Sequence, residues 1–221
     1  NTPCVRLGRI VPHGAAEVWV KLEGGNPTGS YKDRMAVSTL AAALERGDLA
    51  PGDTAVEFTG GSTGTALAFV AGVLGLRFKA VFSDAFSSSK QKAMEAFGAE
   101  VVVEPSHGGG ITQALAERMK ARALRIADQP GHHYVDQFGA PDVRRGYHPM
   151  GHEIAAALPE GVDVFCTSVG TGAAMMGVVD GLEARGIAPD VIALEPAESP
   201  LLTTGTSGAI PRASSPSTTP I

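Results

Sequence analysis

The chain has 221 residues, enough for one large domain or two small ones. Its 18 Lys and Arg residues against 23 Asp and Glu residues give a formal net charge of −5, which excludes the basic field of a typical nucleic-acid-binding protein. The longest apolar stretch has 11 residues, whereas a membrane-spanning helix needs about 20. Two cysteines build neither a disulfide framework nor a metal site, so we expect a cytoplasmic protein in a reducing compartment.

Short runs of β-branched residues alternate with Ala-rich stretches along most of the chain. Buried strands are predicted at Val18–Leu22, Thr54–Phe58, Phe78–Phe82, Val101–Glu104, Asp163–Thr167 and Val191–Leu194. Helices are predicted at Asp33–Arg46, Thr65–Leu74, Ser88–Phe97, Thr112–Ala127, Val143–Ala157 and Ala174–Ala184. This alternation is typical of an α/β fold, whose mostly parallel sheet is covered by helices on both faces.

The end of the sequence departs from this pattern. Of the last 19 residues, Thr203–Ile221, 14 are Ser, Thr, Gly or Pro, and they show no hydrophobic period. Such a composition buries too little apolar surface to offset the conformational entropy of the chain. We therefore expect a disordered tail.

Two glycine-rich turns each connect a predicted strand to a predicted helix. They are Thr59–Gly64 and Ser168–Ala174. In open α/β sheets ligands bind at this edge, and a helix N-terminus with exposed backbone N–H groups attracts anions. Neither turn is a phosphate-binding Walker loop, because no lysine follows, and the second lacks the third glycine of the dinucleotide fingerprint. Taken alone, each is explained as a tight turn.

A third segment, Asn26-Pro27-Thr28-Gly29-Ser30-Tyr31-Lys32-Asp33-Arg34, opens a predicted helix. Most lysines in such a place simply face solvent, but the helix dipole there disfavours the charged amine. An amine of lowered pKa attacks carbonyl carbons and forms Schiff bases. A nucleophilic Lys32 together with two anion-binding turns, one for a phosphate and one for a carboxylate, describes a pyridoxal phosphate enzyme that acts on an amino acid.

These motifs resemble those of the fold-type-II pyridoxal phosphate enzymes, which include cysteine synthase, cystathionine β-synthase and threonine synthase. Residues 26–34 resemble the family's cofactor-lysine motif, residues 59–64 its Thr-Ser-Gly-Asn-Thr-Gly loop, and residues 170–174 its phosphate cup. Four further segments resemble cysteine synthase in particular: Asn1–Pro3, Ala96–Glu100, Gln137-Phe138 and Glu195–Pro200. The resemblance covers about residues 1 to 208.

The resemblance implies a site in this chain, with pyridoxal 5'-phosphate as cofactor and no metal. Lys32 is implied as the catalytic Schiff-base lysine. The other residues implied to bind the cofactor are Ser62, Gly170, Thr171, Gly172, Ala173 and Ala174. Those implied to bind the substrate are Thr59, Gly61, Ser62, Thr63 and Gln137. Two of these depart from the family: Ser62 stands where the family has the Asn that contacts the cofactor hydroxyl, and Ala174 stands where it has Thr.

The resemblance also implies the architecture, two doubly wound parallel-sheet α/β domains with the cofactor in the cleft between them. Residues 35–135 are expected to form the smaller, mobile domain, and residues 1–34 with 136–205 an incomplete larger one. Residues 206–221 are expected to be an irregular tail. Family members are longer and typically homodimers, so we expect a C-terminally truncated chain that forms a homodimer.

The reaction that this resemblance favours is β-replacement on an O-activated L-serine such as O-acetylserine, with sulfide as nucleophile and L-cysteine as product. Threonine synthase or serine/threonine dehydratase chemistry remains an alternative within the same family. A serine hydrolase is a second alternative, because Gly60-x-Ser62-x-Gly64 matches a nucleophile elbow, although the oxyanion-like His107–Gly110 follows it rather than precedes it. A non-catalytic truncated homologue is a further alternative. No nucleic acid or membrane is expected as a partner.

Overall fold

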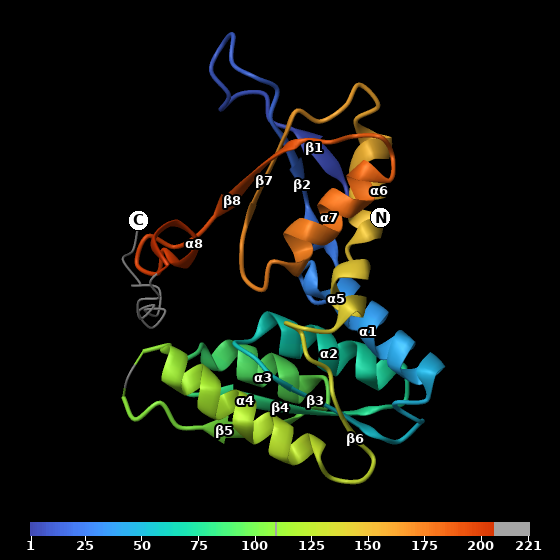
Figure 1. Ribbon diagram of the computed structural model, residues 1–221, viewed down its shortest axis with the longest axis vertical. Coiled ribbons are helices and arrows are strands. Elements are labelled where there is room, and N and C mark those ends of the chain that lie inside the picture. Colours follow the sequence, from blue (N-terminus) through green and yellow to red (C-terminus); the bar gives the residue numbers. More distant parts are fainter. Residues whose placement is uncertain (109, 206–221) are drawn as a thin grey trace. The chain divides into compact units, whose positions relative to one another are not determined.

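The computed structural model describes residues 1–108 and 110–205, which divide into two compact units (Figure 1). The first unit comprises Asn1–Ala42 and Gln137–Leu194, and the second comprises Ala43–Asp136 and the segment that begins at Glu195. The tail expected at residues 206–221 lies outside the described residues. The disordered tail predicted from composition began earlier, at Thr203, but Thr203 and Thr204 end a short helix, α8 (Leu201–Thr204).

The second unit is built on a four-stranded parallel sheet with strand order β5-β4-β3-β6. In chain order its elements are β3 (Thr54–Phe58), α2 (Ser62–Val73), β4 (Arg77–Ser83), α3 (Ser88–Ala96), β5 (Glu100–Glu104), α4 (Gln113–Ala127) and β6 (His132–Tyr134). The parallel α/β class predicted from the sequence is confirmed, with strand bounds within one residue of those expected for β3, β4 and β5.

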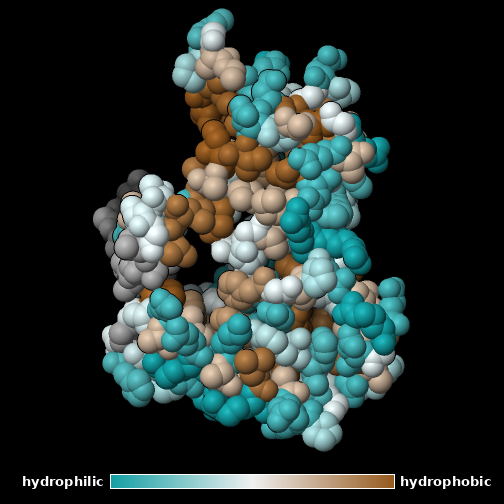
Figure 2. All heavy atoms as spheres, viewed as in Figure 1, coloured by the Kyte–Doolittle hydropathy of each residue, from teal (hydrophilic) through white to brown (hydrophobic). Residues whose placement is uncertain are grey.

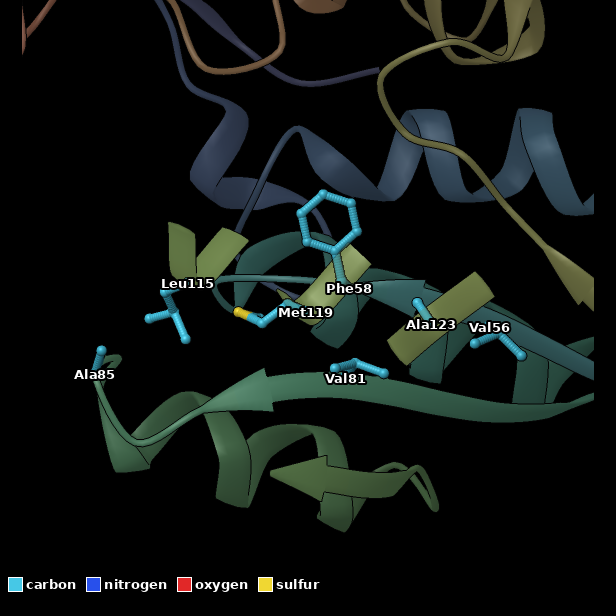
Figure 3. Close-up of a cluster of buried hydrophobic side chains, with 7 residues drawn as sticks. All are labelled: Val56, Phe58, Val81, Ala85, Leu115, Met119 and Ala123. Atoms are coloured by element: carbon cyan, nitrogen blue, oxygen red, sulfur yellow. The ribbon is translucent and has the colours of Figure 1, made fainter. Parts of the chain in front are cut away.

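Helix α4 packs on the face of the sheet opposite to that used by the two earlier helices. From β3 to β5 each connection steps to the next strand in one direction, but α4 leads back across the sheet to β6 on the far side of β3. Because crossovers are right-handed, this reversal moves α4 to the other face. Its apolar side chains and those of β3, β4 and the turn after β4 form a buried cluster (Figure 3). The cluster comprises Val56, Phe58, Val81, Ala85, Leu115, Met119 and Ala123.

Strand β6 was not predicted. Its residues, His132-His133-Tyr134, contain no β-branched run, and strand propensity alone does not select them. Pairing with β3 forms the strand: Thr54 N donates to Gly131 O at 2.8 Å, and Val135 N donates to Val56 O at 3.0 Å. Hydrogen bonding to the edge of β3 therefore makes a strand of a segment whose own strand propensity is low.

The first unit begins with an antiparallel pair, β1 (Cys4–Arg6) and β2 (Trp19–Lys21), followed by a 3₁₀ turn, η1 (Glu23–Gly25). Helix α1 (Lys32–Arg46) comes next, and its residues up to Ala42 belong to this unit. The chain returns to this unit in α5 (Pro141–Arg145), α6 (His148–Ala157), β7 (Val164–Ser168), α7 (Ala173–Glu183) and β8 (Asp190–Leu194). Strands β7 and β8 pair in parallel.

The single helix predicted over Val143–Ala157 is interrupted between α5 and α6. Pro149 prevents a continuous helix here, because it has no N–H to donate to the Arg145 carbonyl and its ring would clash with that carbonyl. Gly146, just before the break, packs directly on α1: a Cβ there would be 2.8 Å from the Ser38 Cβ and 2.9 Å from the Arg34 carbonyl oxygen. Pro149 then occupies the first turn of α6, where its missing N–H costs no helix bond. The interruption lets the chain approach α1 closely and begin a new helix.

Strands β7 and β8 are more exposed than predicted. In β8 all five residues are exposed, and in β7 exposed and half-buried residues alternate; exposed Cys166 is one of them. Helix α7, which lies between these strands in the sequence, packs on α5 and α6 within the described part of the chain. Apolar side chains consequently gather at the surface of this unit, as Figure 2 shows in brown around β1–β2 and β7–β8.

One guanidinium connects the elements that surround the start of α1. Arg34 donates from Nε to Glu23 Oε2 at 2.7 Å and from Nη2 to Glu153 Oε2 at 2.7 Å. Lys21 in β2 also donates to Glu153 Oε2, at 2.6 Å, and the Thr2 hydroxyl donates to Glu23. These side chains are only 10–16% exposed, so solvent screens the charges weakly. The network thus joins β2, η1, α1 and α6.

The substitution Glu153→Gln tests the stabilising role of this network. Burial by itself raises the pKa of the Glu153 carboxyl, but hydrogen bonds from Arg34 and Lys21 overcome this effect and lower the pKa from 4.5 to about 2. Because the folded-state pKa is the lower one, the stabilisation is present above pH 4.5 and is lost as pH falls toward 2. We expect Glu153→Gln to lower the free energy of unfolding at pH 7 by about 1.5–3 kcal/mol.

Urea denaturation followed by circular dichroism at pH values between 2 and 7 measures both effects. The loss caused by Glu153→Gln should shrink as the pH is lowered through this window. Glu160→Gln, which changes an exposed carboxylate in the turn after α6, is the matched control and should leave the profile unchanged. A difference between Glu153→Gln and wild type that stays constant with pH would contradict the assigned role of the carboxylate.

Candidate active site

Lys32 is the first residue of α1, one residue before the predicted start of that helix, and it is buried, with 9% of its surface exposed. The loop before it is held by its own side chains. The Asp33 carboxylate accepts hydrogen bonds from the Thr28 amide, at 2.8 Å, and from the Thr28 hydroxyl. Gly29 between them takes a left-handed φ of 75°. A local hydrogen-bonded turn therefore positions Lys32 at the start of the helix.

The same loop is tied at its beginning to the Arg34 network. Asn26 Nδ2 donates to the carbonyl oxygen and to the carboxylate of Glu23, at 2.8 Å each. Arg34 binds the same carboxylate from the first turn of α1. Glu23 was not among the predicted site residues, because no motif marked it. Its contacts show that it positions the loop from both ends.

The turn at residues 170–174 has an open backbone. Gly172 is the N-cap of α7 with a left-handed φ of 80°, and no side chain caps the helix. A Cβ added at Gly170 or Gly172 would meet no atom within 4 Å in the described part of the chain. Ala173 N donates weakly to Thr171 Oγ1 at 3.4 Å, and the Ala174 amide has no hydrogen-bond partner among the described residues. Such a turn at a helix N-terminus fits a phosphate.

The turn at residues 59–64 is closed around a threonine hydroxyl. Thr59 is 2% exposed, and its Oγ1 accepts hydrogen bonds from the amides of Gly61 and Gly64, both at 3.0 Å. Gly61 has a φ of 140°, which only glycine adopts readily, and α2 begins at the next residue, three residues earlier than predicted. In this structure Thr59 therefore shapes the loop, and half-buried Ser62 is the first residue of the helix.

Neighbouring side chains leave no room for larger residues in this turn. A Cβ on Gly61 would lie 2.7 Å from Lys90 Cγ, and a Cβ on Gly64 would lie 2.3 Å from Met94 Sδ. The turn follows β3 directly, and β6 pairs on the other side of β3, so the strand order reverses at this point. In doubly wound sheets ligands bind outside the carboxyl ends of the strands at such a reversal.

The chain leaves β6 at the same edge of the sheet through a strained residue. Asp136 has a φ of 55°, one of two positive values at non-glycine residues in the described chain. Non-glycine residues take this conformation at a cost that surrounding structure must offset, often near functional sites. The next residue is Gln137, which is 6% exposed. The sequence singled out Gln137 but gave no signal for the conformation of Asp136.

The predicted site residues are divided between the two units. Lys32, Gln137 and the turn at residues 170–174 belong to the first unit, and the turn at residues 59–64 belongs to the second. The expected roles of these residues toward cofactor and substrate remain proposals. Within residues 1–108 and 110–205 no three His, Cys, Asp or Glu side chains are grouped to hold a metal ion. In that same part of the chain, none of the helices has the length and apolar character that a bilayer crossing demands.

Comparison with known proteins identifies the family. The family described as "Pyridoxal-phosphate dependent enzyme" matches residues 1–220. Cysteine synthase B of Salmonella typhimurium is 36% identical over 199 residues, which are 90% of this chain and 64% of the relative. This chain therefore spans less than two thirds of the length of that relative. The match to a pyridoxal phosphate family leaves the serine hydrolase hypothesis without support.

Solved structures agree with this assignment. An O-ureido-L-serine synthase superimposes with a TM-score of 0.85 at 35% identity, covering 96% of this chain and 67% of that one. An O-acetylserine-dependent cystathionine β-synthase from Helicobacter pylori has a TM-score of 0.83 at 30% identity, covering 94% and 67%. The fold-type-II architecture and the cofactor inferred from the sequence are confirmed at the level of the family. The chain belongs to the pyridoxal-phosphate-dependent enzymes of the cysteine synthase type.

Proposed function

We propose that this chain carries out β-replacement on an O-activated L-serine, giving L-cysteine when sulfide is the nucleophile. The observation that carries the proposal is buried Lys32 at the first position of α1, in the same unit as the open turn at residues 170–174. Relatives support the substrate class: one is named for cysteine, one for O-ureido-L-serine and one for its dependence on O-acetylserine. Cysteine, O-ureido-L-serine and O-acetylserine are all three-carbon amino acids with a substituent on Cβ.

In this proposal the chain's own groups hold the cofactor at three points. The backbone N–H groups of Gly170–Ala174 would bind the phosphate, the Lys32 amine would engage the aldehyde carbon, and the Ser62 hydroxyl would be the partner of the ring hydroxyl. When bound, pyridoxal phosphate supplies an electrophilic aldehyde and an electron sink for the carbanion at the amino-acid Cα. Ala174 keeps the amide of the family's Thr but not its hydroxyl, so phosphate binding here depends on backbone donors.

The remaining residues act on the substrate. The first turn of α2, with Ser62 and Thr63, binds the substrate carboxylate, and Gln137 contacts the same group; Thr59 keeps the turn in shape. The Lys32 amine would take the proton from Cα, and the electron pair of that C–H bond would become the second bond between Cα and Cβ as the β-substituent leaves with its own bonding pair. Sulfide would then add at Cβ, and Lys32 would return the proton to Cα. We further propose that the two units serve as the larger and smaller domains. The homodimer and the cytoplasmic location remain predictions.

The first test locates the cofactor lysine. After incubation with pyridoxal phosphate and reduction with borohydride, peptide mass mapping should find the pyridoxyl mass on Lys32, because that amine is buried at the helix start beside the proposed site. Lys32→Ala should lose the visible absorbance of the loaded protein and keep its circular dichroism spectrum. Lys120→Ala, which removes an exposed lysine of α4, should keep both. A label confined to another lysine would disprove the assignment.

The second test concerns the phosphate. Gly172→Val should weaken cofactor binding by about 2–3 kcal/mol, measured by equilibrium titration, because a side chain in the turn displaces several charge-assisted hydrogen bonds. Gly186→Val is the matched control: Gly186 has a similar φ, 77° against 80°, and equally open surroundings, but it follows α7 instead of preceding it. Both variants carry the same backbone strain. Equal cofactor affinity in the two would contradict the role of the turn.

The third test decides the reaction. Loaded protein is given O-acetylserine with sulfide, O-phosphohomoserine, or L-serine alone, and products are separated by chromatography. Cysteine formed only from the first pair supports the proposal. Threonine from O-phosphohomoserine, or an oxo acid with ammonia from serine, would establish the alternative within the family. If the lysine is labelled but none of the substrates is turned over, the chain is a non-catalytic homologue.

A further inference from the structure

The side chain of Lys32 rests on an aromatic ring of the preceding residue. Its Nζ lies 5.2 Å from the centroid of the Tyr31 ring, within the range of a cation–π contact. Lys32 is buried to 9% exposure, so this contact is made where water competes weakly. The ring face carries partial negative charge and attracts an ammonium group. Tyr31 therefore gives the amine a defined resting place beside the helix start.

The Tyr31 ring is itself held by a second tyrosine. The ring centroids of Tyr31 and Tyr147 are 5.8 Å apart with an interplanar angle of 62°, an edge-to-face arrangement. Tyr147 is 0% exposed, and its hydroxyl has no hydrogen-bond partner in the part of the chain that the structure describes. Burial raises the pKa of both tyrosine hydroxyls, so both rings are neutral at physiological pH. The contacts that link the two tyrosines to each other and to Lys32 are therefore made by the aromatic rings and not by the hydroxyl groups.

Tyr147 also touches the helix that starts at the open turn. A Cβ on Gly177 of α7 would lie 2.8 Å from the Tyr147 Cβ and 2.2 Å from the Arg144 carbonyl oxygen. The glycine therefore permits direct contact between α7 and Tyr147, the residue that precedes α6. One continuous line of packed groups leads from the amine of Lys32 through Tyr31 and Tyr147 to α7. All of these groups belong to the first unit.

We propose that Tyr31 and Tyr147 are positioning residues for Lys32, Tyr31 by holding the amine over its ring and Tyr147 by fixing that ring against α7. The proposal rests on the proposed function, in which Lys32 engages the cofactor and takes the Cα proton. An amine that accepts this proton becomes an ammonium ion, and the ring face stabilises that form without forming a bond. Tyr31 then favours the protonated, released lysine over the free amine.

The test compares Tyr31→Leu with Tyr31→Phe. Phenylalanine keeps the ring face and leucine removes it, while both fill the space with apolar atoms. The cofactor-free protein is labelled with trinitrobenzenesulfonate over a range of pH, and labelling of Lys32 is quantified by peptide mass mapping. In Tyr31→Leu the pH of half-maximal labelling should fall by about half a unit to one unit, because the ammonium loses its π partner. In Tyr31→Phe it should stay at the wild-type value. Lys90 in the second unit is the internal reference.

The second residue is tested in the same assay. Tyr147→Phe removes only the unpartnered hydroxyl and should leave the labelling of Lys32 as in wild type. Tyr147→Leu keeps an apolar side chain but removes the edge-to-face ring, and the half-maximal pH should move in the direction seen for Tyr31→Leu by a smaller amount. Circular dichroism checks folding; if Tyr147→Leu unfolds, the Tyr31 pair alone decides the proposal.

A cofactor titration separates this inference from the proposed function. Tyr31→Leu should show visible absorbance of the pyridoxal phosphate complex with a pH dependence displaced from wild type, and Tyr31→Phe should restore it. If the wild type gains no visible absorbance, the proposed function fails, and the trinitrobenzenesulfonate assay still decides the role of the rings. If Tyr31→Leu matches wild type both in labelling and in absorbance, the positioning role is overturned.

Discussion

The bridge that Arg34 forms between Glu23 and Glu153 is the interaction on which the first unit depends. A guanidinium presents its donors in a rigid planar fork, so two carboxylates bound to it are fixed in direction as well as in distance. Here those carboxylates come from η1 and α6, elements far apart in the sequence. Arg34 stands two residues after Lys32. Fixing the guanidinium therefore fixes the start of α1, and the site lysine with it.

Glycines allow close packing among α1, α6 and α7 in the first unit. Gly146 brings the chain onto α1, and Gly151 and Gly181 let α6 and α7 approach so closely that a Cβ on either would lie within 2.5 Å of a carbonyl oxygen of the other helix. Side chains at these points would force the helices apart, because packed interiors accommodate added atoms poorly. The direction of α7, and hence of the open turn at its start, follows from this backbone contact.

The two glycine-rich turns differ in structure, one closed and one open, although their sequences are similar. The turn at residues 59–64 is internally hydrogen-bonded to Thr59 and covered by Lys90 and Met94, so its shape is rigid before any ligand arrives. The turn at residues 170–174 is open on its outer side and leaves the Ala174 amide without a partner among the described residues. This difference agrees with the proposed roles, in which the closed turn would bind a small carboxylate and the open turn a phosphate, which needs several donors at once.

Local sequence patterns determined the fold class of this protein and the position of its candidate lysine. Alternating β-branched and Ala-rich runs specified the parallel α/β class, and the motif around Lys32 placed a lysine at a helix start, because both signals depend on neighbours in the sequence. Strand β6, the close packing of Gly146 on α1 and the exposure of β7–β8 were decided by tertiary structure. Each depends on a partner distant in sequence: the free edge of β3, the surface of α1, and the packing of α7 on α6 instead of on the strands. The contact of Tyr147 with Tyr31 belongs to the same class, since no spacing in the sequence predicts that two distant rings meet.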